Sequence, residues 1–216
     1  MKLKCIIVLL CLPFFCLPRA HSQEDDDWST TLSVGFSVPF FNSELNDSET
    51  IRFDRAGGAL ALGAFLVFEP NGLTFMARLG LGFAQSDVES YDHTFHGGNL
   101  YLMVGVGKRL ALGRLVFIPS VGVGLEGDLL FADYNWSDRQ YDDAALSIDF
   151  LLCSDLTAQF MFTKRLGLEL SCMISTNVTG AARIAADRTG DWDETTCRMK
   201  FGMCNVVPAV LLCMKF

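Results

Sequence analysis

Alternation of apolar and small polar residues is the feature that most limits how this chain can fold. Between Trp28 and Phe40 every second residue except Thr30 is large and apolar, and the residues between them are Ser, Thr, Gly or Pro. Successive side chains of a β-strand point to opposite faces, so a period of two predicts a strand with one apolar face. The pattern recurs and predicts eight strands, approximately at residues 28–40, 57–68, 73–86, 98–110, 115–127, 144–163, 166–178 and 197–216.

The composition indicates the surroundings of these strands. Half of the 216 residues are hydrophobic, only 19% are charged, and the mean hydropathy is +0.31. This is too apolar for an ordinary soluble domain, yet no apolar run reaches the ~18 residues that a membrane-spanning helix needs. The formal net charge of −8, with no basic stripe, excludes a nucleic-acid partner.

The connections between the predicted strands alternate in length. Short links lie at 69–72, 111–114 and 164–165, and the first contains Asn71-Gly72, a pair that supplies positive φ in tight turns. Long links follow the other strands, at residues 41–56, 87–97, 128–143 and 179–196. An even set of antiparallel strands with short links at one end and long links at the other predicts an all-β, up-and-down barrel.

Two barrel types fit eight strands, and they differ in which face lies inside. A soluble lipocalin-type barrel has apolar residues inside, whereas a membrane barrel turns them toward lipid. The other face of these strands consists of Gly, Ser, Thr and Ala with few charges. Such residues make a poor solvated exterior but fit a narrow lumen, so we predict an eight-stranded antiparallel transmembrane β-barrel, with the soluble barrel as the alternative.

The amino terminus has the pattern of a secretory signal peptide. Lys2 and Lys4 precede an apolar stretch at 5–17, and a small-x-small site predicts cleavage between Ser22 and Gln23. We therefore expect a signal peptide at 1–22 and a barrel at 23–216. Lipidation at Cys16 is the alternative, although Phe15 stands where a small residue is preferred.

Charge separates the two ends of the predicted barrel. The four long links hold sixteen acidic residues and five arginines. The basic residues cluster at the short links and the last strand, as Lys108, Arg109, Arg114, Lys164, Arg165 and Lys215. Because the short turns of such barrels face the periplasm, we expect both termini there and the acidic loops outside the outer membrane of a diderm bacterium.

The last predicted strand carries a motif. Phe216 is preceded at alternate positions by Met214, Leu212 and Val210, which resembles the carboxy-terminal assembly signal of bacterial outer-membrane proteins. The stretch 117–124, Phe-Ile-Pro-Ser-Val-Gly-Val-Gly, resembles a strand of the OmpW/OprG family. This resemblance implies a narrow channel for small, mainly apolar molecules, with a lateral opening as one route. The implied partners are outer-membrane lipid, the assembly machinery and the solutes themselves.

The inward face of the predicted barrel gives the candidate lumen residues. Its large apolar members include Phe65, Met76, Tyr101, Ile118, Leu151, Met161, Met173 and Met203, and its charged members include Arg78, Asp149, Asp155 and Glu169. Arg78 lies five residues beyond the first residue of its predicted strand and Glu169 lies three, so they are expected at similar heights. Buried charges must pair or they cost several kcal/mol. A polar gate and an ion pair that plugs a closed barrel both remain open.

Three further features leave alternatives open. Pro119 and Pro208 remove ladder hydrogen bonds, which fits either a lateral gap or a bulge. His93 and His96, near Ser86 and Asp87, are residue types found in catalysis, but nothing fixes their geometry, and we expect no enzyme, cofactor or metal site. Five cysteines follow the signal, at positions 153, 172, 197, 204 and 213, and an odd number leaves at least one thiol unpaired. Aromatic residues in the acidic loops make a surface-binding or structural barrel with a closed lumen the alternative function.

Overall fold

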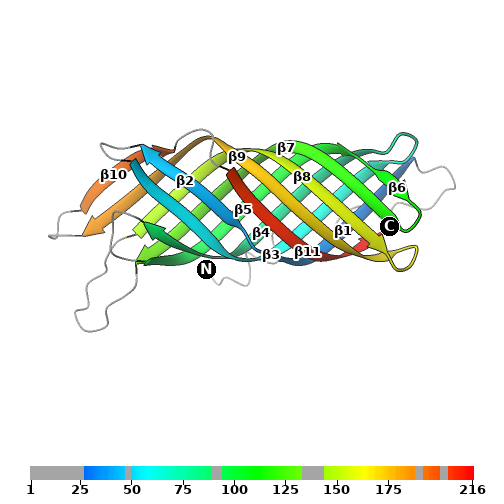
Figure 1. Ribbon diagram of the computed structural model, residues 1–216, viewed down its shortest axis with the longest axis horizontal. Helices are drawn as coiled ribbons and strands as arrows, with labels where there is room; N and C mark the ends of the chain where they lie inside the picture. Colours follow the sequence, from blue (N-terminus) through cyan, green and yellow to red (C-terminus); the bar gives the residue numbers. More distant parts are fainter. Residues whose placement is uncertain (1–26, 47–49, 89–93, 133–143, 188–191, 200–203) are drawn as a thin grey trace, which may run out of the picture.

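The computed structural model describes residues 27–46, 50–88, 94–132, 144–187, 192–199 and 204–216. The predicted signal peptide, its cleavage site at Ser22 and Gln23, and Met203 lie outside these ranges. Every regular element in the described ranges is a β-strand, and the strands wind obliquely around one elongated barrel (Figure 1). Within the described residues, no helix is long and apolar enough to cross a membrane.

The strands form one antiparallel sheet. Their bounds are β1 Trp28–Ser37, β2 Phe40–Asn46, β3 Thr50–Phe68, β4 Leu73–Val88, β5 Thr94–Lys108, β6 Leu110–Leu112, β7 Leu115–Ala132, β8 Ala144–Met161, β9 Leu166–Asp187, β10 Trp192–Met199 and β11 Cys204–Lys215. β2 continues β1 after Val38-Pro39, β6 continues β5 after Arg109, and β10 and β11 both pair with β9. The barrel therefore has eight antiparallel strands, as the alternation predicts.

The first and last strands close the barrel. β1 pairs with β11 from Thr31 opposite Lys215 to Ser37 opposite Ala209. The Phe216 N–H donates to the Thr30 carbonyl at 2.8 Å, which extends this ladder to the end of the chain. This pairing closes the sheet on itself, which is the condition for strands to lie in lipid.

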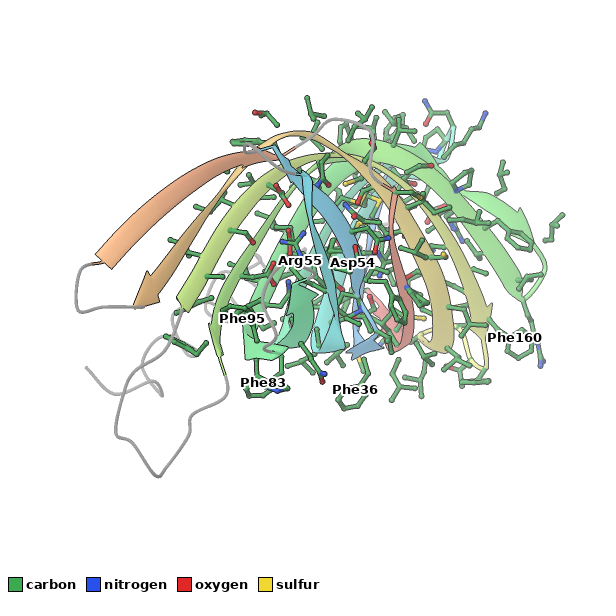
Figure 2. All side chains as sticks on the ribbon, turned by 60° about the vertical axis from the view of Figure 1, so that its left-hand side comes forward. Phe36, Asp54, Arg55, Phe83, Phe95 and Phe160 are labelled. Atoms are coloured by element: carbon green, nitrogen blue, oxygen red, sulfur yellow. The ribbon has the colours of Figure 1, made fainter. Side chains whose placement is uncertain are left out.

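The faces of the strands are arranged as in a membrane barrel. Phe36 on β1 and Phe83 on β4 are 74% and 79% exposed, and Figure 2 shows them pointing away from the barrel. Ser33 and Ala59, on the opposite face of their strands, are buried. Apolar side chains thus cover the exterior, and the soluble lipocalin-type alternative is excluded because it would place them inside.

The strands extend beyond the ranges that alternation predicts. β2 pairs with the first part of β3 from Phe40 opposite Ala56 to Asn46 opposite Thr50, so much of the predicted loop 41–56 is a hairpin. β9 likewise continues to Asp187 beside β10. Backbone pairing does not require apolar side chains, so the ladders continue after the apolar pattern has ended. These extensions lie at the end of the barrel opposite the short turns (Figure 1).

Two of the three short turns use glycine in the left-handed region. Gly72 has φ 71° and Gly113 has φ 64°, values that other residues rarely adopt. In the first turn the Gly72 N–H donates to the Phe68 carbonyl at 2.8 Å, and the Asn71 side chain accepts from the Leu73 N–H. The tight turn predicted from Asn71-Gly72 is therefore present.

Both strand prolines lie within continuous pairing. Pro119 on β7 is opposite Leu156, and Pro208 on β11 is opposite Cys172, with paired residues on either side of each. The Pro208 carbonyl also accepts from the Val38 N–H at 3.0 Å. The break between β1 and β2 lies at this height, where Pro208 and Pro39 each lack an N–H. The strand interruption thus occurs in the first strand, at its seam with the last.

Candidate functional site in the barrel lumen

A cluster of charged residues toward the short-turn end of the barrel, the lower cluster, is centred on Arg78 of β4. Its Nη2 lies 3.2 Å from Asp155 Oδ2 and 2.9 Å from Glu169 Oε1, and it donates to Thr157 Oγ1 at 2.7 Å. The Arg78 side chain is 4% exposed and both carboxylates are fully buried. One guanidinium therefore joins β4 to β8 and β9 inside the barrel, through charge-assisted hydrogen bonds.

Neighbouring side chains hold this cluster in place. Gln159 Nε2 donates to Glu169 Oε2 at 3.0 Å, and Thr157 Oγ1 donates to Asp155 Oδ2 at 2.6 Å. The Arg78 guanidinium also lies 5.5 Å from the ring centroid of Phe65, a cation–π distance. Each of the two carboxylates thus has a polar neighbour besides the arginine.

The middle of the lumen is filled by larger, mainly apolar side chains. Tyr101 donates to Ser37 Oγ at 2.8 Å, and its ring lies over Gly80, where a Cβ would overlap it. Buried residues that belong to the same apolar cluster are Phe65, Met76, Met103, Ile118, Leu151, Cys153 and Met173. Eight strands leave little more than side-chain space inside, and these side chains occupy it.

A second cluster, the upper cluster, lies toward the end of the barrel opposite the short turns. It is centred on Arg55 of β3, which Figure 2 shows inside the barrel. Its Nη1 lies 2.7 Å from Asp128 Oδ2 and 3.3 Å from Glu126 Oε2, and its Nη2 lies 3.3 Å from Asp149 Oδ2. All four side chains are fully buried. Asn99 donates to both Asp128 and Glu126, at 2.7 and 3.1 Å.

A line of asparagines connects the upper cluster to the closing seam. Asn177 Nδ2 donates to Asp149 at 3.5 Å, Asn205 Nδ2 donates to Asn177 at 2.7 Å, and the Asn42 N–H donates to Asn205 Oδ1 at 2.8 Å. Asn42 lies on β2 and Asn205 on β11, where β2 and β11 share only the Phe40–Val206 pair. Side-chain hydrogen bonds thus replace backbone pairing on this part of the seam.

The predicted lumen residues fall into different groups. Phe65, Met76, Leu151 and Met173 are buried in the lumen, and the structure brings Arg78, Asp155 and Glu169 together. Asp149 joins the upper cluster instead, because it lies near the opposite end of β8. Met161 is only half-buried at the short-turn end.

Sequence reasoning does not single out Arg55, Glu126 and Asp128. Arg55 and Asp128 lie within predicted long links, and the structure places them on strands. The signal that could have found them is parity: Arg55 is an even number of positions from Phe65, and Asp128 from Ile118. Residues that keep the parity of known inward positions continue to face the lumen for as long as the strand continues.

The remaining candidate groups lie apart from these clusters. His96 is an exposed residue of β5, whereas His93 lies outside the described residues. Among the described residues, no group of three or more His, Cys, Asp or Glu side chains is arranged to hold a metal ion. Cys153, Cys172, Cys204 and Cys213 are free thiols, and Cys153 and Cys213 are buried.

Comparison with solved structures identifies the fold. OprG from Pseudomonas aeruginosa aligns with a TM-score of 0.62 and 13% identity over 87% of this chain and 95% of OprG. A major outer membrane protein from Thermus thermophilus aligns with a TM-score of 0.57 and 16% identity over 87% and 99% of the two chains. The outer membrane protease OmpT from Escherichia coli aligns with a TM-score of 0.52 and 9% identity over 92% and 99%.

This chain has the fold of an outer-membrane β-barrel. The expected likeness to OprG is confirmed at the level of the fold. No family model matches the sequence, and no curated protein matches it significantly. Because the structural neighbours include a protease, the fold alone does not distinguish transport, binding and catalysis.

Proposed function

We propose that the chain is an outer-membrane protein that provides a narrow, gated passive passage for small, mainly apolar molecules. The observation that supports this proposal is the Arg78 cluster, in which one flexible side chain reaches across the lumen to Asp155 and Glu169 on other strands. Ionisable residues inside a membrane segment are expensive to bury, and they often mark pathways. Loss of the contacts to Asp155 and Glu169 would free the Arg78 side chain without breaking any backbone hydrogen bond between strands.

The rest of the lumen supports the choice of cargo. The buried apolar side chains of the lumen include Met103, Leu151, Cys153 and Met173. Methionine is flexible and polarisable, so such a lining adapts to small apolar molecules without fixed hydrogen bonds. The eight-stranded bore is too narrow for the wide aqueous pore of larger porins. No catalytic role is proposed: His96 is an exposed residue of β5, and His93 lies outside the described residues.

The orientation belongs to the same proposal. We place the short turns in the periplasm and the long links outside the cell, as in other barrels of this kind. The carboxy-terminal strand would then present Phe216 to the periplasmic assembly machinery. Cleavage by added protease in intact cells should remove only long-link sites.

The test is flux through the purified protein. Planar bilayers should show small conductance steps, and proteoliposomes should take up a small apolar solute faster than empty liposomes. Replacing Arg78 with Ser should raise both, whereas Arg165→Ser, an arginine loss at the exposed rim, should leave them near the native level. Absence of flux in the native protein and in Arg78→Ser would refute the passage.

A closed barrel that acts through its surface is the second candidate. It is favoured by the upper cluster, where the Arg55 guanidinium contacts Glu126, Asp128 and Asp149, and none of these side chains is exposed. If flux is absent, the long links become the functional surface. Exchanging those links with the links of another eight-stranded barrel should then transfer binding, whereas a passage would remain with the strands.

A further inference from the structure

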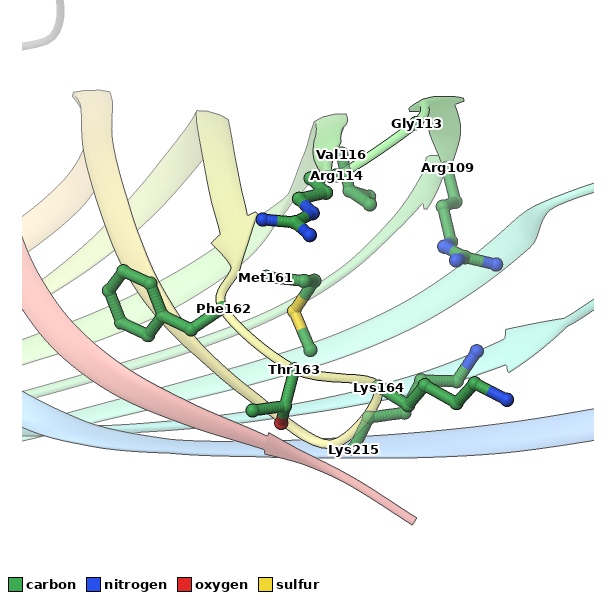
Figure 3. A pocket seen from close by; sticks show the side chains of 9 residues that line it. All are labelled: Arg109, Gly113, Arg114, Val116, Met161, Phe162, Thr163, Lys164 and Lys215. Atoms are coloured by element: carbon green, nitrogen blue, oxygen red, sulfur yellow. The ribbon is translucent and has the colours of Figure 1, made fainter.

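A basic cavity opens at the short-turn end of the barrel. Its volume is about 600 Å³, and Arg109, Arg114, Lys164 and Lys215 line it (Figure 3). Val116, Met161 and Phe162 supply the apolar part of its lining. The cavity is separate from the two arginine clusters, and its role does not depend on a passage through the lumen.

The positive charges in this cavity are only partly balanced. Glu69 is paired with Arg109 at 2.5 Å and with Lys215 at 2.8 Å. Arg114 and Lys164 come from two other turns, and neither has an acidic partner among the residues that the structure describes. Four cations therefore face one acid around a single cavity, which leaves a positive excess directed into it.

A hydroxyl donor accompanies the free cations. Thr163 Oγ1 accepts hydrogen bonds from the N–H groups of Arg165 and Leu166, at 3.2 and 2.9 Å. Its own hydrogen is therefore available to a further acceptor, and Thr163 is part of the cavity lining. In Figure 3, Lys164 and Lys215 point in the same direction, toward the side of the cavity where Arg109 lies.

We propose that this cavity binds a phosphate-type anion, either free in solution or as the headgroup of an anionic lipid. Guanidinium and ammonium groups from several turns would contact its oxygens with the Thr163 hydroxyl, through charge-assisted hydrogen bonds. A concave site lined by one sign of charge also concentrates ions of the opposite sign. The anion would neutralise the positive charge of Arg114 and Lys164, which Glu69 does not balance.

The test uses the full-length barrel in net-neutral phosphatidylcholine nanodiscs, titrated with inorganic pyrophosphate at fixed ionic strength. The double variant Arg114→Gln/Lys164→Gln should weaken pyrophosphate binding at least about tenfold, a loss of about 1.4 kcal/mol or more. The matched control is Lys108→Gln/Arg165→Gln, which removes the same charge from exposed residues of this rim outside the cavity lining. It should change the affinity less than about twofold. Near-ultraviolet circular dichroism checks that both variants are folded.

A second arm distinguishes the source of the ligand. Nanodiscs that contain phosphatidylglycerol should leave pyrophosphate binding intact if the ligand is a free anion, and should compete with it if the ligand is a lipid headgroup. Both results support the site. No pyrophosphate binding to the native protein, or equal losses in the two double variants, would overturn it, because the rim would then act only as a diffuse charge.

Discussion

Arg78 and Glu169 are 91 positions apart in the chain, yet their side chains meet at 2.9 Å across the full width of the barrel. β4 and β9 are separated by four strand positions in either direction around the eight-stranded ring, so this ion pair spans the diameter. Arg55 on β3 and Asp149 on β8 have the same relationship. Two diametric contacts therefore tie opposite walls together, one toward each end.

Removing Arg78 should destabilise the barrel strongly. In Arg78→Met, Asp155 and Glu169 stay buried without a cation, and loss of one partner of a buried pair costs about 3–5 kcal/mol. Urea unfolding in lipid vesicles, followed by tryptophan fluorescence, measures the difference. The double variant Arg78→Met/Glu169→Gln should lose clearly less than the sum of the two single losses. Additive losses would mean that the pair is not coupled.

The upper cluster should depend on the shape of its cation as well as on its charge. Arg55 uses two nitrogens to reach Asp128 and Asp149, a fork that an ammonium group does not reproduce. Arg55→Lys should lower the free energy of unfolding by about 1.5–3 kcal/mol, the contribution of a charged hydrogen bond. Arg55→Met should lose more. If Lys restores full stability, charge alone is sufficient at this position.

The lumen clusters show how far sequence reasoning reaches. The period of two identifies the inward face, because alternate residues face lipid and lumen and therefore differ in size and polarity. It does not give the ends of the strands, since β3 begins at Thr50 and β7 continues to Ala132, beyond the predicted ranges 57–68 and 115–127. Alternation therefore assigns Arg55 and Asp128 to loops, although their parity matches that of Phe65 and Ile118. The pairing of Arg78 with Glu169 can be predicted by comparing their positions along predicted strands. The pairing of Arg55 cannot, because Arg55 and Asp128 lie beyond the strand ends that alternation predicts.

The break in the first strand is also beyond the sequence pattern. Alternation extends from Trp28 to Phe40 with Thr30 as its one exception, so it predicts one strand over 28–40. The structure ends β1 at Ser37 and begins β2 at Phe40. Pro39 lies on β1's own continuation, but the opposing Pro208 comes from the other end of the chain. The two prolines, each without an N–H, come to the same height only because β1 pairs with β11 when the barrel closes.

Charge on the lipid face should cost most near the middle of the membrane. Leu79 and Leu73 lie on the same face of β4, six residues apart, and Leu73 adjoins the first short turn. Leu79→Arg should cost about 2–4 kcal/mol and Leu73→Arg about 0–1 kcal/mol. Reversible unfolding from phospholipid vesicles measures both. Equal costs would contradict the depth that the register gives these residues.

Glu69 should make the short-turn rim sensitive to acid. Partial burial favours the neutral carboxyl, but hydrogen bonds from Lys215 and Ser29 and the charge of Arg109 outweigh it and lower the pKa of Glu69. Because the pKa is lower in the folded state, the stabilising contribution is present above the ordinary glutamate pKa and is lost as pH falls through the lowered value. Thermal unfolding of native protein and Glu69→Gln should differ at neutral pH and converge in acid. A constant difference would exclude this linkage.

Phe216 should matter for assembly in cells more than for stability. Its side chain is 67% exposed, whereas its N–H donates to the Thr30 carbonyl at 2.8 Å, a bond that Phe216→Ala retains. Refolding of this variant into detergent should therefore be nearly unchanged, since little packing is lost. If the alternating residues Val210, Leu212, Met214 and Phe216 are an assembly signal, surface levels in cells should collapse.

Phe160→Ala, which removes another exposed lipid-facing ring near the same rim, is the matched control and should assemble normally. Equal loss of refolding and surface display in Phe216→Ala would assign the residue to stability, because recognition by the assembly machinery has no counterpart in a detergent refolding assay.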